Sequence, residues 1–162
     1  TFVTVPNFIG RWTRFVNRGR ILLGDRCRFR EYRIRHHIAV INPDAVLELD
    51  DRCFLSDGVN ICAAKRIFIG ADTRVAPNVT IFDTNFHQIS EGEDVFEAEV
   101  VIEKNVWIGT NSIVLPGVRV GAHSVIAANS VVSRDIPSKT LAAGSPAQAI
   151  KQIQCSDDWV RK

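Results

Sequence analysis

The stretch VIEKNVWIGTNSIVLPGVRVGAHSVIAANSVVS, residues 101–133, decides the fold of this chain. A β-branched aliphatic residue recurs in it every six positions, at Ile102, Ile108, Val114, Val120, Ile126 and Val132. Small or compact residues stand two places before several of these positions, at Ser112, Val118, Ser124 and Ser130. Glycine directly follows two of them, at Gly109 and Gly121. Chance rarely produces five consecutive steps of six residues.

A period of six matches neither common secondary structure, because an α-helix repeats every 3.6 residues and an ordinary strand every two. It does suit a coil with three flat faces. Each face then buries one aliphatic side chain near the axis, and small residues form each corner. Repeats of this kind form a parallel β-helix, in which neighbouring coils bury a continuous core. We therefore expect an all-β solenoid.

The same spacing is present earlier in the chain. Leu49, Leu55 and Ile61 are six apart, and so are Ile69, Val75 and Ile81. Between Ile81 and Ile102 the separation is 21 residues. One turn of three six-residue faces uses about 18, so we expect about three surplus residues to leave the prism as a loop within residues 83–100. Loops on a regular scaffold often carry function.

The two ends lack this spacing, and a solenoid needs its ends covered. In residues 1–20 the apolar positions follow a helical spacing, which predicts a short amphipathic cap; they are Phe8, Ile9, Trp12, Phe15 and Val16. Ser145 before Pro146 is typical of a helix start, which predicts a short helix within residues 134–162. The whole chain is predicted as a single domain with coils over residues 21–133.

Composition is that of an ordinary globular protein, with 162 residues, 46% of them hydrophobic and 23% charged. No apolar run approaches the roughly 18 residues of a membrane span, and the first residues lack the layout of a signal peptide. The four cysteines form no C-x-x-C pair. We interpret Cys27 and Cys53 as small inward-facing residues, which favours a cytoplasmic location.

Charge is distributed unevenly. Residues 1–35 hold nine arginines against Asp25 and Glu31, a net charge of about +7, which leaves about −5 on the rest because the chain totals +2. Solvated arginines around a cap explain this, and the alternative is a face for an anionic substrate, lipid or nucleotide. Weak contact of this segment with a membrane surface is a further alternative. No nucleic-acid-binding module is recognisable.

The four histidines are the candidates for metal binding or proton transfer. His36 and His37 are adjacent, and the other two are distant in sequence, so the spacing predicts no metal site. We interpret His36 and His37 as surface or cap groups and His123 as a solvated corner residue. His87 lies in the expected loop, where it is either a loop residue with no catalytic role or a general base near neutral pH.

Three segments resemble the hexapeptide-repeat acyltransferases, the sugar and polysaccharide O-acetyltransferases in particular. They are IGADTRVAPNVTIFDTNFH (69–87), VWIGTNSIVLPGVRVGAHSVIAANSVVSRDIP (106–137) and AAGSPAQAI (142–150). The resemblance implies a left-handed parallel β-helix and a homotrimer with active sites between subunits. It also implies acetyl-CoA as co-substrate.

The resemblance further implies roles for single residues. His87 matches the catalytic histidine, a general base that takes the proton of an acceptor hydroxyl as its oxygen attacks the thioester, without a covalent enzyme intermediate. Thr110, after Gly109, matches the backbone N–H that stabilises the oxyanion. Other positions along the acetyl-CoA groove correspond to Trp107, Gly109, Ala128, Ser133, Arg134 and Lys151, and Gln148 departs from a position that is often basic. Positions near the acceptor correspond to Ser56 or Asp57, Asp83 and Asn85.

Together these features predict an acetyl-CoA-dependent O-acetyltransferase that acts on a sugar hydroxyl without a metal. Galactoside-type relatives begin with a longer helical segment, so we expect a larger glycan or a nucleotide-linked sugar as acceptor. The alternatives are an N-acetyltransferase on an amino sugar or its nucleotide derivative, and a non-catalytic β-helix scaffold. The histidine spacing argues against a metal-dependent hydratase.

Overall fold

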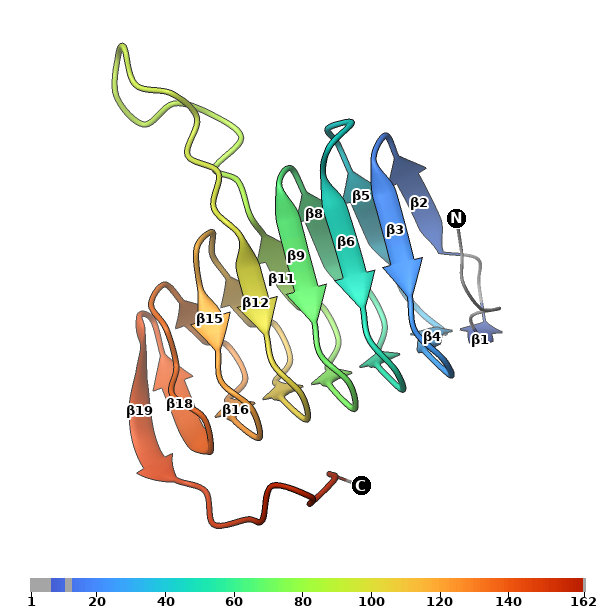
Figure 1. Cartoon of the computed structure of the whole chain (residues 1–162), viewed down its shortest axis with the longest axis vertical. Coiled ribbons are helices and arrows are strands. Elements are labelled where there is room, and N and C mark those ends of the chain that lie inside the picture. The colour runs from blue at the N-terminus through green and yellow to red at the C-terminus, as the bar shows by residue number, and fades with distance from the viewer. Residues whose placement is uncertain (1–6, 11–12, 162) are drawn as a thin grey trace.

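The chain winds through short strands stacked into three sheets, which form the faces of a prism (Figure 1). The structure is a computed structural model that describes residues 7–10 and 13–161. Within these ranges there is no helix, and accordingly none that is long and apolar enough to cross a membrane.

Each coil of the prism contributes a strand to each face in turn. Sheet A has eight strands, β1 (Asn7–Gly10), β4 (Arg28–Glu31), β7 (Phe54–Leu55), β10 (Arg74–Val75), β13 (Trp107–Ile108), β16 (Val125–Ile126), β18 (Thr140–Gly144) and β19 (Ala147–Gln152). Sheet B has six, β2 (Arg14–Asn17), β5 (His37–Val40), β8 (Asn60–Ala63), β11 (Thr80–Phe82), β14 (Ile113–Val114) and β17 (Val131–Val132). Sheet C has five, β3 (Arg20–Leu23), β6 (Val46–Leu49), β9 (Arg66–Ile69), β12 (Val100–Ile102) and β15 (Arg119–Val120). Strands from successive coils pair in parallel, so the predicted all-β parallel architecture is confirmed, and it is consistent with the left-handed β-helix expected.

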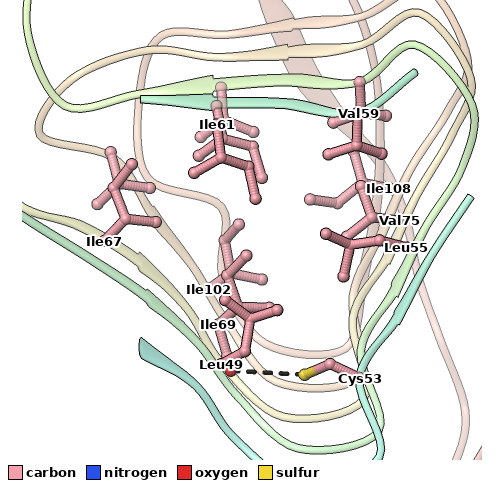
Figure 2. Close-up of a cluster of buried hydrophobic side chains, with 14 of the residues drawn as sticks. Leu49, Cys53, Leu55, Val59, Ile61, Ile67, Ile69, Val75, Ile102 and Ile108 are labelled. Carbon is pink, nitrogen blue, oxygen red and sulfur yellow. Dashed lines mark hydrogen bonds between the residues drawn. The ribbon is translucent and has the colours of Figure 1, made fainter. Parts of the chain in front are cut away.

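The six-residue lattice forms the core of the prism. Ile61 pairs with Ile81 in the next coil of sheet B, and Ile69 pairs with Ile102 in sheet C. These side chains are buried and lie in columns inside the prism (Figure 2). Cys53 is also buried, and its Sγ donates to Gly70 O at 3.3 Å. Burial of each aliphatic side chain contributes about 1.5–3 kcal/mol relative to leaving it exposed, so the stacked columns hold the coils together.

Among the described residues, neither predicted terminal helix is present. Residues 7–10 and 14–17 form β1 and β2, which extend sheets A and B by pairing with β4 and β5. Residues 1–6 and 11–12 of the predicted cap lie outside the described residues. Near the other end, Ser145 and Pro146 form the turn between β18 and the antiparallel β19. Pairing satisfies the backbone groups of an open sheet edge, and this outweighs the local helix signals.

The loop that leaves the prism is longer than the spacing predicts. β11 of sheet B is followed by β12 of sheet C, so Ile81 and Ile102 lie on neighbouring faces. A separation of 21 residues thus takes the place of about six. Residues 83–99 form the projecting yellow-green loop of Figure 1, and Val100 belongs to β12. The expected surplus of three residues was wrong because it assumed a full extra turn.

Gly70 should not tolerate a side chain. An added Cβ would lie 2.6 Å from Lys104 N and 2.7 Å from Glu103 C, both backbone atoms of the next coil. We expect Gly70→Ala to lower the free energy of unfolding by about 1–3 kcal/mol, measured by urea denaturation. Ser90→Ala on the exposed part of the long loop is the control, because it introduces no new atom into a close backbone contact. Equal losses in the two variants would contradict this steric explanation.

Candidate active site

A cavity of about 350 Å³ lies where the outer side of sheet A turns toward sheet B. Its lining includes four of the residues that the resemblance assigns to the acetyl-CoA groove, Trp107, Gly109, Thr110 and Ala128. We call this cavity the sheet A trough. Trp107 alternates with the buried Ile108 on β13, so its ring faces outward and is 44% exposed.

Close contact between two coils shapes the trough. A Cβ on Gly109 would lie 2.5 Å from Ala128 N, so glycine is required for this approach. The N–H of Gly109 donates to Ile126 O at 2.8 Å. The next N–H, that of Thr110, has no acceptor among the described residues. It can therefore donate to an oxyanion placed in the trough.

A second cavity, of about 380 Å³, adjoins the trough and shares Val125 and Leu141 with it. Lys151 and Arg161 line this second cavity. Lys151, which the resemblance assigns to the acetyl-CoA groove, thus lies beside the trough. The sequence predicts no role for Arg161.

Three other residues named for the groove are not part of either cavity. Gln148 is exposed on β19. Ser133 and Arg134 directly follow β17, at the corner between sheets B and C, and both are exposed. Within one protomer, Ser133 and Arg134 therefore lie at a different corner of the prism from the trough.

His87 projects from a loop whose base is ordered. Thr84 and Glu97 form an antiparallel bridge, and Asn85 N donates to Phe96 O at 3.0 Å. The N–H of His87 donates to Asn85 O at 2.7 Å, and the His87 side chain is exposed. The exposed imidazole is thus accessible to a substrate.

In one chain His87 and the trough occupy different corners of the prism. The loop with His87 leaves between β11 and β12, at the corner of sheets B and C. Thr110 lies between β13 and β14, at the corner of sheets A and B. The face formed by sheet B lies between these corners.

Asp83 caps the backbone of the preceding coil. Its carboxylate is fully buried and accepts from Ala64 N at 2.6 Å and from Lys65 N at 2.8 Å. Burial raises the pKa of Asp83 above its ordinary value, against the effect of these hydrogen bonds. Asp83 thus stands at the root of the loop, with both oxygens directed to backbone amides.

Removal of this carboxylate should weaken the fold. We expect Asp83→Ala to lower the free energy of unfolding by about 1–3 kcal/mol, because buried amides lose their acceptor. Urea denaturation measures the change, and Asp94→Ala on the exposed part of the loop is the control. If Asp83→Ala unfolds at the wild-type urea concentration, the capping role is wrong.

Ser56 and Asp57 contact the arginine-rich early coil. Ser56 is buried and its Oγ accepts from Arg30 Nη2. Asp57 Oδ1 accepts from Tyr32 N at 2.6 Å and from Arg33 N at 2.8 Å. Although partial burial opposes them, the N–H donors lower the pKa of Asp57 below its ordinary value. Both candidate acceptor residues are therefore also structural.

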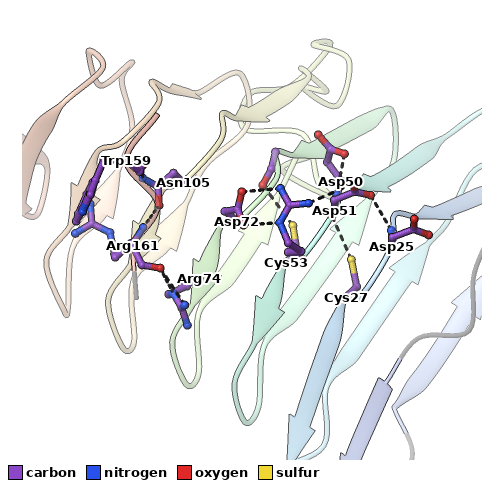
Figure 3. A network of polar contacts seen from close by, with 12 residues as sticks. Asp25, Cys27, Asp50, Asp51, Cys53, Asp72, Arg74, Asn105, Trp159 and Arg161 are labelled. Carbon is purple, nitrogen blue, oxygen red and sulfur yellow. Dashed lines mark hydrogen bonds and ion pairs between the residues drawn. The ribbon is translucent and has the colours of Figure 1, made fainter. Parts of the chain in front are cut away.

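A segment that the sequence reasoning missed crosses the corner between sheets C and A (Figure 3). Asn105 Nδ2 donates to Trp159 O at 2.7 Å, and Asn105 Oδ1 accepts from Arg161 N at 2.9 Å. Arg74 Nη2 donates to Arg161 O at 3.0 Å. These residues follow no lattice, so their spacing contains no signal of the contact.

Two histidines interpreted as surface groups are buried. His123 lies under the crossing segment, with its Nδ1 at 2.8 Å from Asn105 Nδ2. His36 Nδ1 accepts from Val59 N at 3.2 Å, and its Nε2 is 3.8 Å from Glu31 Oε1. Burial lowers the pKa of both imidazoles. In the described part of the chain, no three His, Cys, Asp or Glu side chains gather as a metal site.

Comparison with known proteins identifies the class. The sequence family described as "Bacterial transferase hexapeptide (six repeats)" matches residues 99–134. The galactoside O-acetyltransferase of Lactococcus lactis is 44% identical over 95 residues, 56% of this chain and 45% of that protein. A putative lipopolysaccharide biosynthesis O-acetyl transferase of Escherichia coli is 34% identical over 119 residues, 66% of this chain and 61% of that protein.

Among solved structures, a hexapeptide-repeat acetyltransferase of Vibrio cholerae complexed with acetyl coenzyme A matches with a TM-score of 0.63 and 31% identity. The match covers 67% of this chain and 61% of that one. Over 67% of its length the chain is thus similar to a hexapeptide-repeat acetyltransferase, and residues 99–134 match the hexapeptide transferase repeat. The part that matches spans about half the length of the first curated relatives, 45% and 46%.

Proposed function

We propose that the protein transfers an acetyl group from acetyl-CoA to a sugar hydroxyl. The observation that carries this proposal is the sheet A trough, which joins Trp107, Gly109, Thr110 and Ala128 in one cavity. The V. cholerae relative, 31% identical, was solved with acetyl coenzyme A. The relatives from L. lactis and E. coli are named as O-acetyltransferases, of a galactoside and in lipopolysaccharide biosynthesis.

The chemistry requires a base, a positioned thioester and an oxyanion donor. His87 takes the proton of the acceptor hydroxyl while the oxygen attacks the thioester carbonyl carbon. The carbonyl oxygen becomes an oxyanion, which the Thr110 N–H stabilises. Collapse of this intermediate breaks the carbon–sulfur bond and releases the CoA thiolate, which takes up a proton. No covalent bond to the protein forms.

A trimer would complete this site. Because His87 and the trough occupy different corners of one chain, we propose that His87 of one protomer serves the trough of its neighbour. Mixed assemblies of His87→Ala and Ala128→Trp chains test this, since the second substitution fills the trough. Each variant alone should be inactive, and mixing should restore part of the activity. No recovery in confirmed mixed trimers would place both groups in one protomer.

An acceptor screen tests the reaction itself. Purified protein with acetyl-CoA and a panel of sugars and glycans should release free thiol, and mass spectrometry should show an added acetyl group. Loss of that group in mild alkali identifies an O-ester, whereas an alkali-stable product would establish an N-acetyltransferase. Failure to bind CoA by calorimetry would leave a non-catalytic scaffold. Because the donor is a metabolite of the cell interior, we propose a cytoplasmic location, which cell fractionation can check.

A further inference from the structure

The outer face of sheet A carries a row of alternating cations and aromatic rings. Four side chains stand in register across β4, β7, β10 and β13, namely Arg28, Phe54, Arg74 and Trp107. Each is followed by a buried residue, so all four face outward. Neighbouring strands are about 4.8 Å apart, which makes the row about 14 Å long. It ends at the sheet A trough, because Trp107 lines that cavity.

Positive charge accumulates along this row. The guanidinium carbons of Arg28 and Arg30 are each 5.3 Å from the centre of the Phe54 ring. Among the described carboxylates, Asp57 forms an ion pair here, at 3.6 Å from Arg30 Nε. Arg74 donates to a backbone carbonyl and not to a carboxylate. The guanidinium groups of Arg28, Arg30 and Arg74 thus have one carboxylate partner between them, Asp57.

A row in which aromatic rings alternate with guanidinium groups suits an anionic carbohydrate as ligand. The apolar face of a sugar ring packs on an aromatic side chain, and guanidinium groups bind carboxylates and phosphates through paired hydrogen bonds. Trp107 is 44% exposed, so its ring offers a face for a sugar, whereas the half-buried Phe54 ring packs against the guanidinium groups of Arg28 and Arg30. A ligand along this row would enter the trough at Trp107.

We propose that Arg28, Arg30, Phe54, Arg74 and Trp107, the sheet A row, bind the acceptor, and that the acceptor is a sugar or glycan bearing carboxylate or phosphate groups. This inference rests on the proposed acetyl transfer, whose substrate class it names. The row gives the acceptor a direction, because its charged part pairs with the arginines and its neighbouring hydroxyl reaches the thioester at Thr110. The proposal also assigns acceptor binding to two arginines of the basic N-terminal segment, Arg28 and Arg30.

Calorimetry with defined probes tests the row without requiring turnover. The probes are a galacturonate trisaccharide, its carboxyl-reduced neutral counterpart, and UDP-glucose. The protein should bind an anionic probe more tightly than the neutral one, and added salt should weaken that binding. Preference for the trisaccharide would identify a carboxylate acceptor, and preference for UDP-glucose a diphosphate.

Substitution of one arginine locates the binding. Arg28→Gln should weaken binding of the anionic probe about fivefold and leave the neutral probe unchanged. Arg20→Gln is the matched control, because Arg20 is an exposed strand arginine of the same basic segment on sheet C. In turnover assays, Arg28→Gln should raise the KM for the acceptor and not that for acetyl-CoA.

Several outcomes would overturn the proposal that the sheet A row binds the acceptor. These are equal binding of neutral and anionic probes, unchanged affinity in Arg28→Gln, or binding to phosphatidylglycerol vesicles but to neither anionic probe. Binding of an anionic probe without any acetyl transfer would reject the proposed function and retain the row. Acetylation of a neutral glycan that Arg28→Gln leaves unaffected would retain the function and reject the row.

Discussion

Replacing His87 with alanine should lower turnover by about 10²- to 10⁴-fold, the contribution typical of a positioned general base. An acceptor hydroxyl is a poor nucleophile until its proton is removed, and His87 is the exposed imidazole at the base of the long loop. Thiol release from acetyl-CoA measures the change. Because the side chain is exposed, the melting temperature should not move, and CoA should bind with wild-type affinity.

His37→Ala is the matched control for this prediction. His37 is also exposed, on β5, where its Nδ1 lies 3.1 Å from Asn60 Oδ1 and away from the trough. It should retain wild-type turnover. Near-normal turnover in His87→Ala would reject the base mechanism, and loss of CoA binding in that variant would show that His87 serves the donor instead.

Truncation of Ile61 should cause the largest loss of stability, about 2–5 kcal/mol for Ile61→Ala. Ile61, labelled in Figure 2, is fully buried in β8. It pairs with Ile38 of the preceding coil and with Ile81 of the next. Alanine would leave a cavity in the middle of a column, where β pairing on both sides prevents the coils from closing it. Urea denaturation measures the difference.

Ile89→Ala tests whether position, and not residue type, causes this loss. Ile89 is 80% exposed on the long loop, so its truncation should change the free energy of unfolding by less than about 0.5 kcal/mol. Ile61→Val should lie between the two, at about 0.5–1.5 kcal/mol. Comparable losses in Ile61→Ala and Ile89→Ala would contradict a core built on the six-residue lattice.

Where sequence expectation and structure differ, local signals competed with sheet pairing. The apolar spacing of residues 1–20 and the pair Ser145–Pro146 both predict helices. The structure instead has strands β1 and β2 near one end, and a turn between strands β18 and β19 near the other. A strand that extends a sheet satisfies its backbone groups along its whole length, whereas a short isolated helix is marginal. His123 occupies the corner that the spacing predicts, and its burial depends on a segment 36 residues later in the chain.

The sequence alone determined the parallel β-helix and its buried lattice. This was possible because each six-residue repeat is a short-range pattern, and successive repeats place the same kinds of residue at the same positions. Tertiary structure alone decided which outward-facing residues are neighbours. Arg28, Phe54, Arg74 and Trp107 are separated by tens of residues, and Arg161 contacts Arg74 from 87 residues later in the chain. Their contacts depend on coil register, turn length and the path of residues 155–161, which no short-range pattern specifies.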